Sequence, residues 1–468
     1  MKVEQIYTGC LAQGAYYIES NGEAAIIDPL RETKPYLEKA TANGAKIKYI
    51  FETHFHADFV SGHLDLAKKT GAKIIYGPTA STSYEIHEGK DNEIFKLGNV
   101  TLQLLHTPGH TPESSTFLLK DENGKEHAIF SGDTLFIGDV GRPDLAQKAG
   151  DITQEDLAGW LFDSLRNKIM TLPDEVIVYP AHGAGSACGK HMSKETWDTL
   201  GNQKATNYAL RANMTKAEFI KEVTDGLLPP PQYFAKNAKM NKLGYDSFDE
   251  VMKRGAVALS SRAFEAAANE HEALILDVRD KKEFVKGFIP NSVFIGIDGG
   301  FAPWVGALIP DLKQPILIVA PEGRAAEVVK RLSRVGYDNA IGYLEGGFEA
   351  WKGHGEIDSI EAIDAKDFVA AYDKDLKVLD VRKLGEWESE HIETAQHFAL
   401  DYINEQMAEV NKDNTYYMHC KSGYRVTVAA SILKSRGFEN LVILHDKFDE
   451  LIASTIPTSA FVCPSTLK

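Results

Sequence analysis

The sequence predicts an α/β protein of several domains, and three observations indicate this class. The chain has 468 residues, which is too long for a single hydrophobic core. Residues 1 to about 225 contain short β-branched or apolar runs, such as AAIIDP and HAIFSGD, separated by helix-like stretches. Beyond them, an order of strand, helix, strand, loop and helix occurs twice, which predicts a doubly wound parallel α/β sheet in each copy.

Composition excludes several classes of function. Hydrophobic residues make up 43% of the chain and charged residues 25%, as in an ordinary globular protein. No apolar run approaches the roughly 20 residues that span a bilayer, and the N-terminus lacks the pattern of a secretory signal. The net charge of −16 disfavours nucleic acid or an anionic membrane as partner. Four widely spaced cysteines without a CxxC pair fit a reducing compartment, so we expect a cytoplasmic protein.

The first candidate site is the stretch THFHADFVSGH, residues 53–63. His54, His56 and Asp58 alternate there, as side chains do when they turn from the end of a strand toward a common point. A fourth metal ligand often follows the Asp in such a loop, but this chain has Phe59, which cannot bind a metal. The loop therefore predicts a metal site and leaves open whether one metal or two are bound.

Three further ligand-type residues follow other predicted strands. They are His110 in HTPGHT, Asp133 in FSGDTLF and His182 in YPAHGAG. Each lies near Gly or Pro, which fits a tight and rigid loop. Histidine and carboxylate are common ligands of zinc and of non-haem iron. One such residue alone would be an ordinary surface histidine or aspartate, but the whole set at strand ends indicates a metal centre.

Together THFHAD, TPGHT, SGDTLF and PAHG resemble the metallo-β-lactamase superfamily over residues 1 to about 225. The resemblance implies an αββα sandwich with the site at one edge. Dinuclear hydrolases of this superfamily, such as glyoxalase II, bridge their two metals with the Asp that matches Asp133. Their second metal needs a His at the position of Phe59.

The sequence is more similar to the persulfide dioxygenases, in which HADF also occurs. This resemblance implies one Fe(II) per chain, held by His54, His110 and Asp133. It places His56 outside the ligand set, although spacing alone would admit His56 as a ligand. Arg142 and Asp144 in GRPDLAQ are interpreted as a structural ion pair near the site.

Three further residues are expected beside the metal. Asp58 and His182 are predicted to hydrogen-bond the ligands. Cys188, in GAGSACGK, follows His182 closely in the sequence. A thiol there would either relay sulfur or serve as a small packing residue, and the sequence favours neither interpretation.

A linker and an internal repeat define the rest of the chain. Pro229 to Pro231 exclude helix and sheet. Residues 273–293 match residues 376–396, and in both an apolar strand ends in Asp-Val-Arg. We therefore predict three domains, residues 1–235, 236–357 and 358–468.

The loop CKSGYR, residues 420–425, lies between a predicted strand and a predicted helix. Backbone N–H groups of such a loop form an anion cradle, and the helix N-terminus adds positive potential. Both effects favour a reactive thiolate, so Cys420 is the candidate nucleophile. The polar, glycine-containing loop argues against a buried and inert cysteine. Arg425 closes the loop and is expected to fix an anionic substrate.

Cys-x-x-x-x-Arg after LDVR resembles a rhodanese sulfurtransferase. The resemblance implies that Cys420 accepts a sulfane sulfur as a persulfide and passes it on. Asp380 and Arg382 of LDVR are interpreted as support for the fold. The first copy has Ala320 in place of the cysteine and a loop one residue shorter, so we predict that it has no catalytic activity.

The whole chain resembles a persulfide dioxygenase–rhodanese fusion of the bacterial, sulfide-detoxifying type. This implies that a low-molecular-weight thiol persulfide and O₂ give sulfite. Cys420 would then transfer sulfane sulfur to sulfite, making thiosulfate, or act in reverse. A homo-oligomer is expected. Two alternatives are a metal-dependent thioester hydrolase of the glyoxalase II type joined to a rhodanese, and a sulfur-binding sensor or carrier without turnover. No motif selects the carrier thiol.

Overall fold

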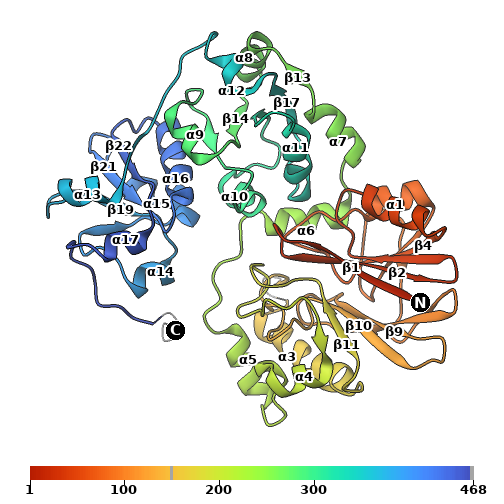
Figure 1. Ribbon diagram of the computed structural model, residues 1–468. Coiled ribbons are helices and arrows are strands. Elements are labelled where there is room, and N and C mark those ends of the chain that lie inside the picture. Colours follow the sequence, from red (N-terminus) through yellow and green to blue (C-terminus); the bar gives the residue numbers. More distant parts are fainter. Residues whose placement is uncertain (148–150, 464–468) are drawn as a thin grey trace. The chain divides into compact units, whose positions relative to one another are not determined.

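The computed structural model describes residues 1–147 and 151–463 (Figure 1). It separates into two compact units, Met1–Phe248 with Ser333–Gly336, and Asp249–Leu332 with Tyr337–Lys468. The first unit thus extends beyond residue 235. The three predicted domains stay predictions, and residues 464–468 of the last one lie outside the described residues.

The first unit contains two six-stranded sheets. The first sheet has the order β1-β2-β3-β4-β5-β6, with the bounds β1 (Lys2–Thr8), β2 (Gln13–Ser20), β3 (Glu23–Ile27), β4 (Lys46–Phe51), β5 (Lys73–Tyr76) and β6 (His87–Glu88). The second has the order β12-β11-β10-β9-β8-β7, with the bounds β7 (Ile94–Leu97), β8 (Val100–His106), β9 (Ser115–Lys120), β10 (Glu126–Gly132), β11 (Ile177–Pro180) and β12 (Asp198–Thr199).

The two sheets pack face to face, and helices cover their outer faces. Alternate side chains of both sheets form the core between them, where Phe51 and Phe117 have ring centroids 4.7 Å apart. The helices of this unit are α1 (Lys34–Ala42) and α2 (His63–Thr70) on the first sheet, α3 (Gln154–Ser164), α4 (Leu200–Thr206) and α5 (Lys216–Thr224) on the second, and α6 (Phe234–Leu243) after the proline linker. The αββα sandwich expected from the sequence is confirmed.

Strand ends bring the predicted site residues to one edge of this sandwich. The loop 53–63 follows β4, Asp133 follows β10, and His182 follows β11. The connection after β10 is tight, because Gly132 has a φ of +54° and a Cβ there would lie 2.6 Å from the Thr53 side chain. Only glycine allows this approach, so the strand end and the metal loop are held together.

The second unit contains two parallel five-stranded sheets of the same topology. The first has the order β13-β17-β16-β14-β15 and comprises β13 (Ala258–Leu259), β14 (Leu274–Asp277), β15 (Val293–Phe294), β16 (Ile316–Val319) and β17 (Ala340–Leu344). The second has the order β18-β22-β21-β19-β20 and comprises β18 (Glu361–Ile363), β19 (Val378–Asp380), β20 (Ala395–His397), β21 (Tyr416–His419) and β22 (Leu441–Leu444). The repeat seen in the sequence is therefore a repeat of folds.

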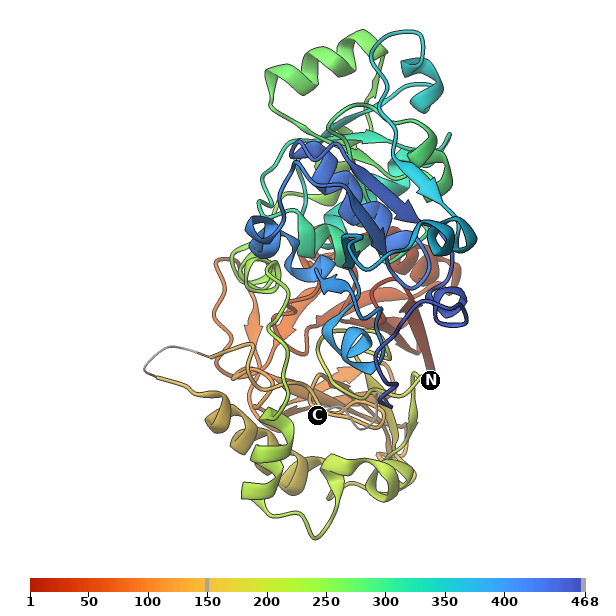
Figure 2. The ribbon, with the colours of Figure 1, turned by 90° about the vertical axis from the view of Figure 1, so that its left-hand side faces the viewer.

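Helices accompany both sheets of the second unit. In the cysteine-containing copy, α16 lies against β21 and β22 (Figures 1 and 2). The helices are α7 (Phe248–Gly255), α8 (Ser261–Glu270), α9 (Lys281–Lys286), α10 (Phe301–Leu308), α11 (Ala325–Arg334) and α12 (Gly347–Trp351), then α13 (Ala365–Ala371), α14 (Leu384–Ser389), α15 (Ile403–Gln406), α16 (Tyr424–Ser435) and α17 (Phe448–Ile452).

The Asp-Val-Arg elements support the fold in both copies, as the sequence predicts for Asp380 and Arg382. Arg382 donates to Asp380 at 2.6–2.9 Å and to the Glu390 carbonyl at 2.7 Å. Arg279 makes the same pair with Asp277, with 2.7–3.0 Å between the atoms. Each arginine thereby ties a strand end to the turn after the following helix.

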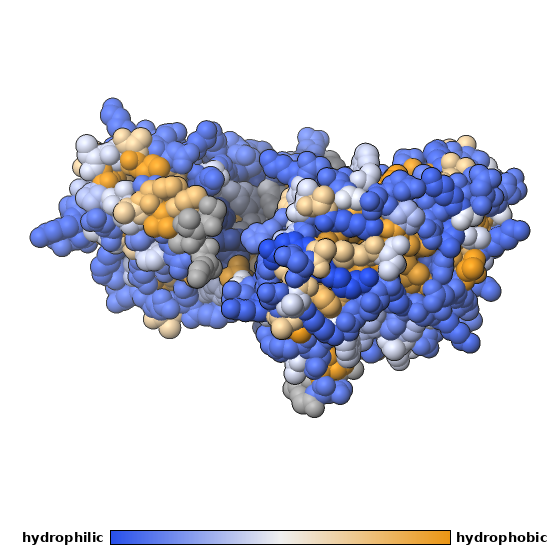
Figure 3. Space-filling view, turned by 90° about the horizontal axis from the view of Figure 1, so that it is seen from below, coloured by the Kyte–Doolittle hydropathy of each residue, from blue (hydrophilic) through white to orange (hydrophobic). Residues whose placement is uncertain are grey.

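Polar residues cover much of the surface. The face in Figure 3 is largely hydrophilic, with small apolar patches. Within residues 1–147 and 151–463, no helix has the length and apolar character needed to cross a membrane.

Candidate metal centre and cysteine loop

Two histidines and one aspartate meet at the edge of the sandwich. The Nε2 atoms of His54 and His110 lie 3.8 Å and 3.4 Å from the same Asp133 oxygen, Oδ2. All three side chains are at most 2% exposed. A metal ion bound about 2.1 Å from each nitrogen and oxygen would fit between ligand atoms at these separations.

Hydrogen bonds direct both imidazoles toward this centre. His110 Nδ1 lies 2.9 Å from the Arg142 carbonyl oxygen, which can only accept, so Nδ1 carries the proton. His54 Nδ1 lies 3.0 Å from the Thr53 hydroxyl oxygen, and that hydroxyl donates to Asp28 at 2.9 Å. Because the Thr53 hydroxyl already uses its proton in the bond to Asp28, His54 Nδ1 must donate its own proton to the hydroxyl oxygen. Both Nε2 atoms keep a free lone pair, as metal ligation requires.

The carboxylate of Asp133 lacks a partner that the metal would supply. Among the described residues, neither of its oxygens accepts a hydrogen bond, and both are buried. A buried ionised carboxylate is costly unless a cation compensates it. Burial and the neighbouring histidines also lower the pKa of His54 well below its ordinary value, so this ring is neutral and ready to ligate. The donor set fits a divalent metal.

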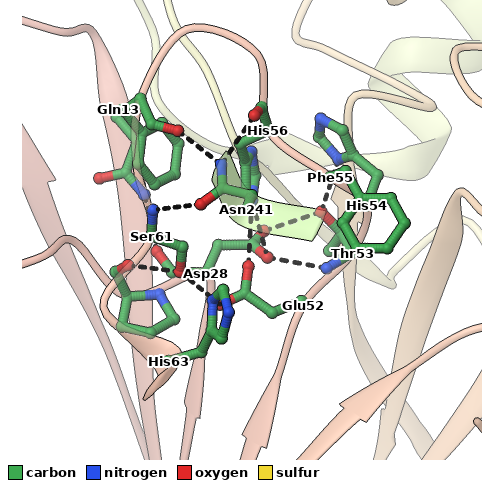
Figure 4. A network of polar contacts seen from close by, with 12 residues as sticks. Gln13, Asp28, Glu52, Thr53, His54, Phe55, His56, Ser61, His63 and Asn241 are labelled. Atoms are coloured by element: carbon green, nitrogen blue, oxygen red, sulfur yellow. Dashed lines mark hydrogen bonds and ion pairs between the residues drawn. The ribbon is translucent and has the colours of Figure 1, made fainter. Parts of the chain in front are cut away.

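His56 lies beside this centre, and its Nε2 is engaged by carboxylates. Its Nε2 lies 3.1 Å from Asp28 Oδ1 and 3.6 Å from Glu52 Oε2, and all three side chains are buried. Figure 4 shows them in one polar network beneath the metal loop. Although burial acts in the opposite direction, the charges of Asp28 and Glu52 raise the pKa of His56 to about 9. The other ring nitrogen, Nδ1, is buried without a hydrogen-bond partner among the described residues, and a ligand atom of His56 lies within 4.8 Å of ligand atoms of Asp58 and His182. The outer position expected for His56 therefore stays a prediction.

Phe59 takes part in holding His56 there. Its side chain is fully buried, and its ring packs on the His56 ring with centroids 4.3 Å apart. Asn241 of α6 fixes the backbone of the same loop. Its amide nitrogen donates to the carbonyls of His56 and Phe59 at 2.8 Å, and its oxygen accepts from the Ser61 N–H at 2.9 Å.

Replacing Asn241 with Ala should therefore loosen the metal loop. Two buried carbonyls and one N–H would lose their partner, which we expect to cost about 3 kcal/mol. The Ser61 amide should then exchange about 100-fold faster in hydrogen–deuterium exchange. The neighbouring, exposed Lys242→Ala variant is the control. Unchanged exchange in Asn241→Ala would mean that the loop is held by other contacts.

A second group of ligand-type side chains lies on the other side of Asp133. His182 Nε2 is 3.5 Å from Asp58 Oδ2 and 3.6 Å from Asp133 Oδ1. These distances are too long for direct hydrogen bonds, so the predicted bonds to the ligands stay a prediction. Cys188 is buried, and its sulfur lies within 4.8 Å of ligand atoms of Asp133 and His182. Burial and the nearby carboxylates of Asp58 and Asp133 raise the pKa of the Cys188 thiol well above its ordinary value.

His110, one of the three ligands, lines a cleft of about 430 Å³. The Arg142–Asp144 ion pair, with 2.7 Å between its atoms, lies beside His110 and is the structural pair that the sequence predicts. The cleft is large enough for part of a small thiol cofactor. Its lining includes Phe55, Ala57, His110, Thr111, Lys239 and Lys242.

In the cysteine loop, the expectation that Cys420 is not buried is wrong. Its side chain is 2% exposed, because it continues β21 and points inward, whereas the next two loop residues are exposed. The polar composition of the loop therefore reflects these exposed residues and not the buried cysteine. The Gly423 N–H donates to the Cys420 sulfur at 3.1 Å, as in the expected cradle of N–H groups. Gly423 has a φ of +83°, which favours glycine.

Arg425 is engaged by a carboxylate. Its guanidinium donates to both oxygens of Glu386 in α14, at 2.5 Å and 2.8 Å. Its role in fixing an anionic substrate therefore stays a prediction. In the first copy, Ala320 occupies the cysteine position, and Arg324 pairs with Glu327 and Asp298.

Sequence reasoning missed the residues that support the metal centre. Asp28 and Glu52 directly follow β3 and β4, so the strand-end rule applied to the ligands would also have indicated them. Asn241 gives no such signal, because it lies beyond the proline linker in an ordinary helix sequence.

Comparison with known proteins agrees with the two-part architecture. Residues 8–182 match the Metallo-beta-lactamase superfamily, and residues 260–354 and 364–453 match the Rhodanese-like domain. The human mitochondrial persulfide dioxygenase ETHE1 is 30% identical over 47% of this chain and 78% of that protein. A probable hydroxyacylglutathione hydrolase of Schizosaccharomyces pombe is 30% identical over 43% of this chain and 76% of that protein.

A solved structure covers more than the first domain. A metallo-beta-lactamase from Staphylococcus aureus subsp. aureus COL is 33% identical, with a TM-score of 0.64, over 74% of this chain and 98% of that one. The chain belongs to the metallo-beta-lactamase superfamily, as a fusion of an ETHE1-related domain with two rhodanese-like domains.

Proposed function

We propose that the protein is a persulfide dioxygenase and sulfurtransferase. Its substrates are a low-molecular-weight thiol persulfide and O₂, and its first products are sulfite and the free thiol. The observation that carries the proposal is the three-ligand centre of His54, His110 and Asp133, with the Nε2 of His56 engaged by Asp28. Two histidines and one carboxylate with open positions are typical of non-haem Fe(II) oxygenases.

One Fe(II) held by these ligands would supply positions where persulfide and O₂ meet. The chain's own residues prepare the site. Thr53 and the Arg142 carbonyl keep both ligand rings in the correct tautomer, and Phe59 keeps His56 on its carboxylates. The reaction balances as RSSH + O₂ + H₂O giving RSH, sulfite and two protons.

Cys420 carries out the second reaction, the transfer of sulfane sulfur to sulfite. Its thiolate attacks the outer sulfur of another persulfide, the S–S bond breaks, and the carrier thiol leaves after taking up a proton. Sulfite then attacks the new persulfide on Cys420, forms thiosulfate and restores the thiolate. The reverse direction uses the same groups. The Gly423 N–H on the Cys420 sulfur stabilises negative charge there.

The cleft beside His110 supports a carrier with anionic groups. Lys239 and Lys242 line it, and their charges favour carboxylates or phosphates, as in glutathione or coenzyme A. Turnover with both persulfides, followed by assays of sulfite and thiosulfate, tests the two reactions together. Formation of neither product would contradict the proposal. A cytoplasmic location and a homo-oligomeric state stay predictions.

The alternative is a dinuclear thioester hydrolase of the glyoxalase II type. The side chains of Asp58 and His182 favour it, because they lie beside Asp133 as a second metal would need. Phe59 opposes it, because the remaining ligand position is apolar. Hydrolysis of S-lactoylglutathione by protein that contains two metals, without O₂ uptake from persulfide, would establish the alternative.

Replacing Phe59 with His should increase the number of metal ions bound per chain. The new imidazole would join Asp58 and His182 and complete a second position, so metal content should rise from about one to about two per chain. Metal analysis after reconstitution measures this, with Phe59→Leu as the apolar control that keeps one metal. A Phe59→His variant with one metal would show that Phe59 does not set the stoichiometry.

A further inference from the structure

The copy that lacks a cysteine contacts the cysteine loop of the other copy. Lys281, the first residue of α9, donates from Nζ to the Ser422 carbonyl. A Cβ built on Gly423 would lie 2.9 Å from the same Nζ. The ammonium group therefore lies directly on the backbone of the loop that surrounds Cys420.

Other contacts fix this arrangement. The Tyr424 hydroxyl at the start of α16 donates to the Gly296 carbonyl at 2.9 Å, and the Phe294 N–H donates to the Ser431 hydroxyl at 2.9 Å. The Tyr424 and Phe294 rings are 5.8 Å apart. Both sides of the contact belong to one compact unit, so the position of Lys281 over the loop is built into the fold.

The charge of Lys281 differs from that of Arg425. Arg425 is neutralised by Glu386, whereas no carboxylate of the described residues pairs with Lys281. The first copy has no thiol of its own, and Ala320 stands at the equivalent position. A cation with only a carbonyl partner remains available to an anion that approaches the loop.

We propose that Lys281 is a positioning and specificity residue for Cys420. It holds the Ser422 carbonyl and supplies the loop with positive charge, which favours dianionic sulfite and thiosulfate over neutral sulfur compounds. The inference rests on the proposed sulfur transfer at Cys420. It also gives the copy without a cysteine a function: it completes the site of its neighbour.

The test compares Lys281→Met with Lys282→Met, the exposed neighbour, and with Lys281→Arg. In the thiosulfate:cyanide assay, Cys420 thiolate takes the outer sulfur of thiosulfate, sulfite leaves with the electron pair, and cyanide removes the sulfur as thiocyanate. Lys281→Met should raise the KM for thiosulfate about fivefold and change kcat less than about twofold. Lys281→Arg should restore the KM, and Lys282→Met should leave it unchanged.

A second readout does not depend on turnover. Iodoacetate is anionic and iodoacetamide is neutral, so the ratio of their alkylation rates at Cys420, followed by peptide mass spectrometry, reports charge at the loop. Lys281→Met should lower this ratio about fivefold. An unchanged ratio, or a fall in kcat with an unchanged KM and ratio, would overturn the inference. A wild-type protein that transfers no sulfur would contradict the proposed function, while the ratio would still decide the role of Lys281.

Discussion

The Asp133→Asn variant is expected to lose bound metal and O₂ uptake while it retains sulfur transfer. Asp133 is the only carboxylate of the three-ligand group, and both of its oxygens lack a hydrogen-bond partner among the described residues. Asparagine has the same shape but no charge. We expect metal content to fall to about a tenth and O₂ uptake to fall at least about 100-fold.

The melting temperature of the Asp133→Asn variant shows whether it has lost only its metal or also its fold. Both Asp133 oxygens are buried without a hydrogen-bond partner among the described residues, so replacement with an uncharged side chain should leave the melting temperature unchanged or raise it. Metal analysis, an O₂ electrode and calorimetry measure these effects. Asp163→Asn, at a half-exposed surface ion pair, is the control. A variant that keeps its metal and its O₂ uptake would contradict the ligand assignment.

The Cys420→Ser variant is expected to lose sulfur transfer while it retains O₂ uptake. Serine lacks a sulfur nucleophile, so the thiosulfate:cyanide reaction should fall at least about 1,000-fold. O₂ uptake from persulfide should survive, and sulfite should accumulate in place of thiosulfate. Cys463→Ser, at an exposed cysteine, is the control and should transfer sulfur normally. Loss of both reactions in Cys420→Ser would contradict two independent sites.

Much of the architecture could be predicted because it rests on local patterns. Apolar strands that end in His or Asp predicted where His110, Asp133 and His182 would meet, since neighbouring strand ends converge at one edge of a sheet. The repeated Asp-Val-Arg element predicted two copies of one topology. These signals lie within short stretches of the chain, so their meaning does not depend on distant residues.

The supporting contacts could not be predicted in the same way. Asn241 reaches the loop of His56 from about 180 residues away, and Lys281 reaches the Cys420 loop from the other copy. Such contacts depend on tertiary packing, which leaves no periodic pattern in the sequence. The burial of Cys420 was misjudged for a related reason, because loop composition describes the exposed positions and not the inward end of β21.

The central claim is tested most directly by O₂ consumption of anaerobically iron-loaded protein. Glutathione persulfide and coenzyme A persulfide would be supplied side by side, and sulfite and thiosulfate would be assayed. The account predicts O₂ uptake with formation of sulfite or thiosulfate, and the relative rates would rank the two carriers. No uptake with either persulfide, together with zinc in the purified protein and hydrolysis of a thioester, would contradict the dioxygenase and favour the hydrolase.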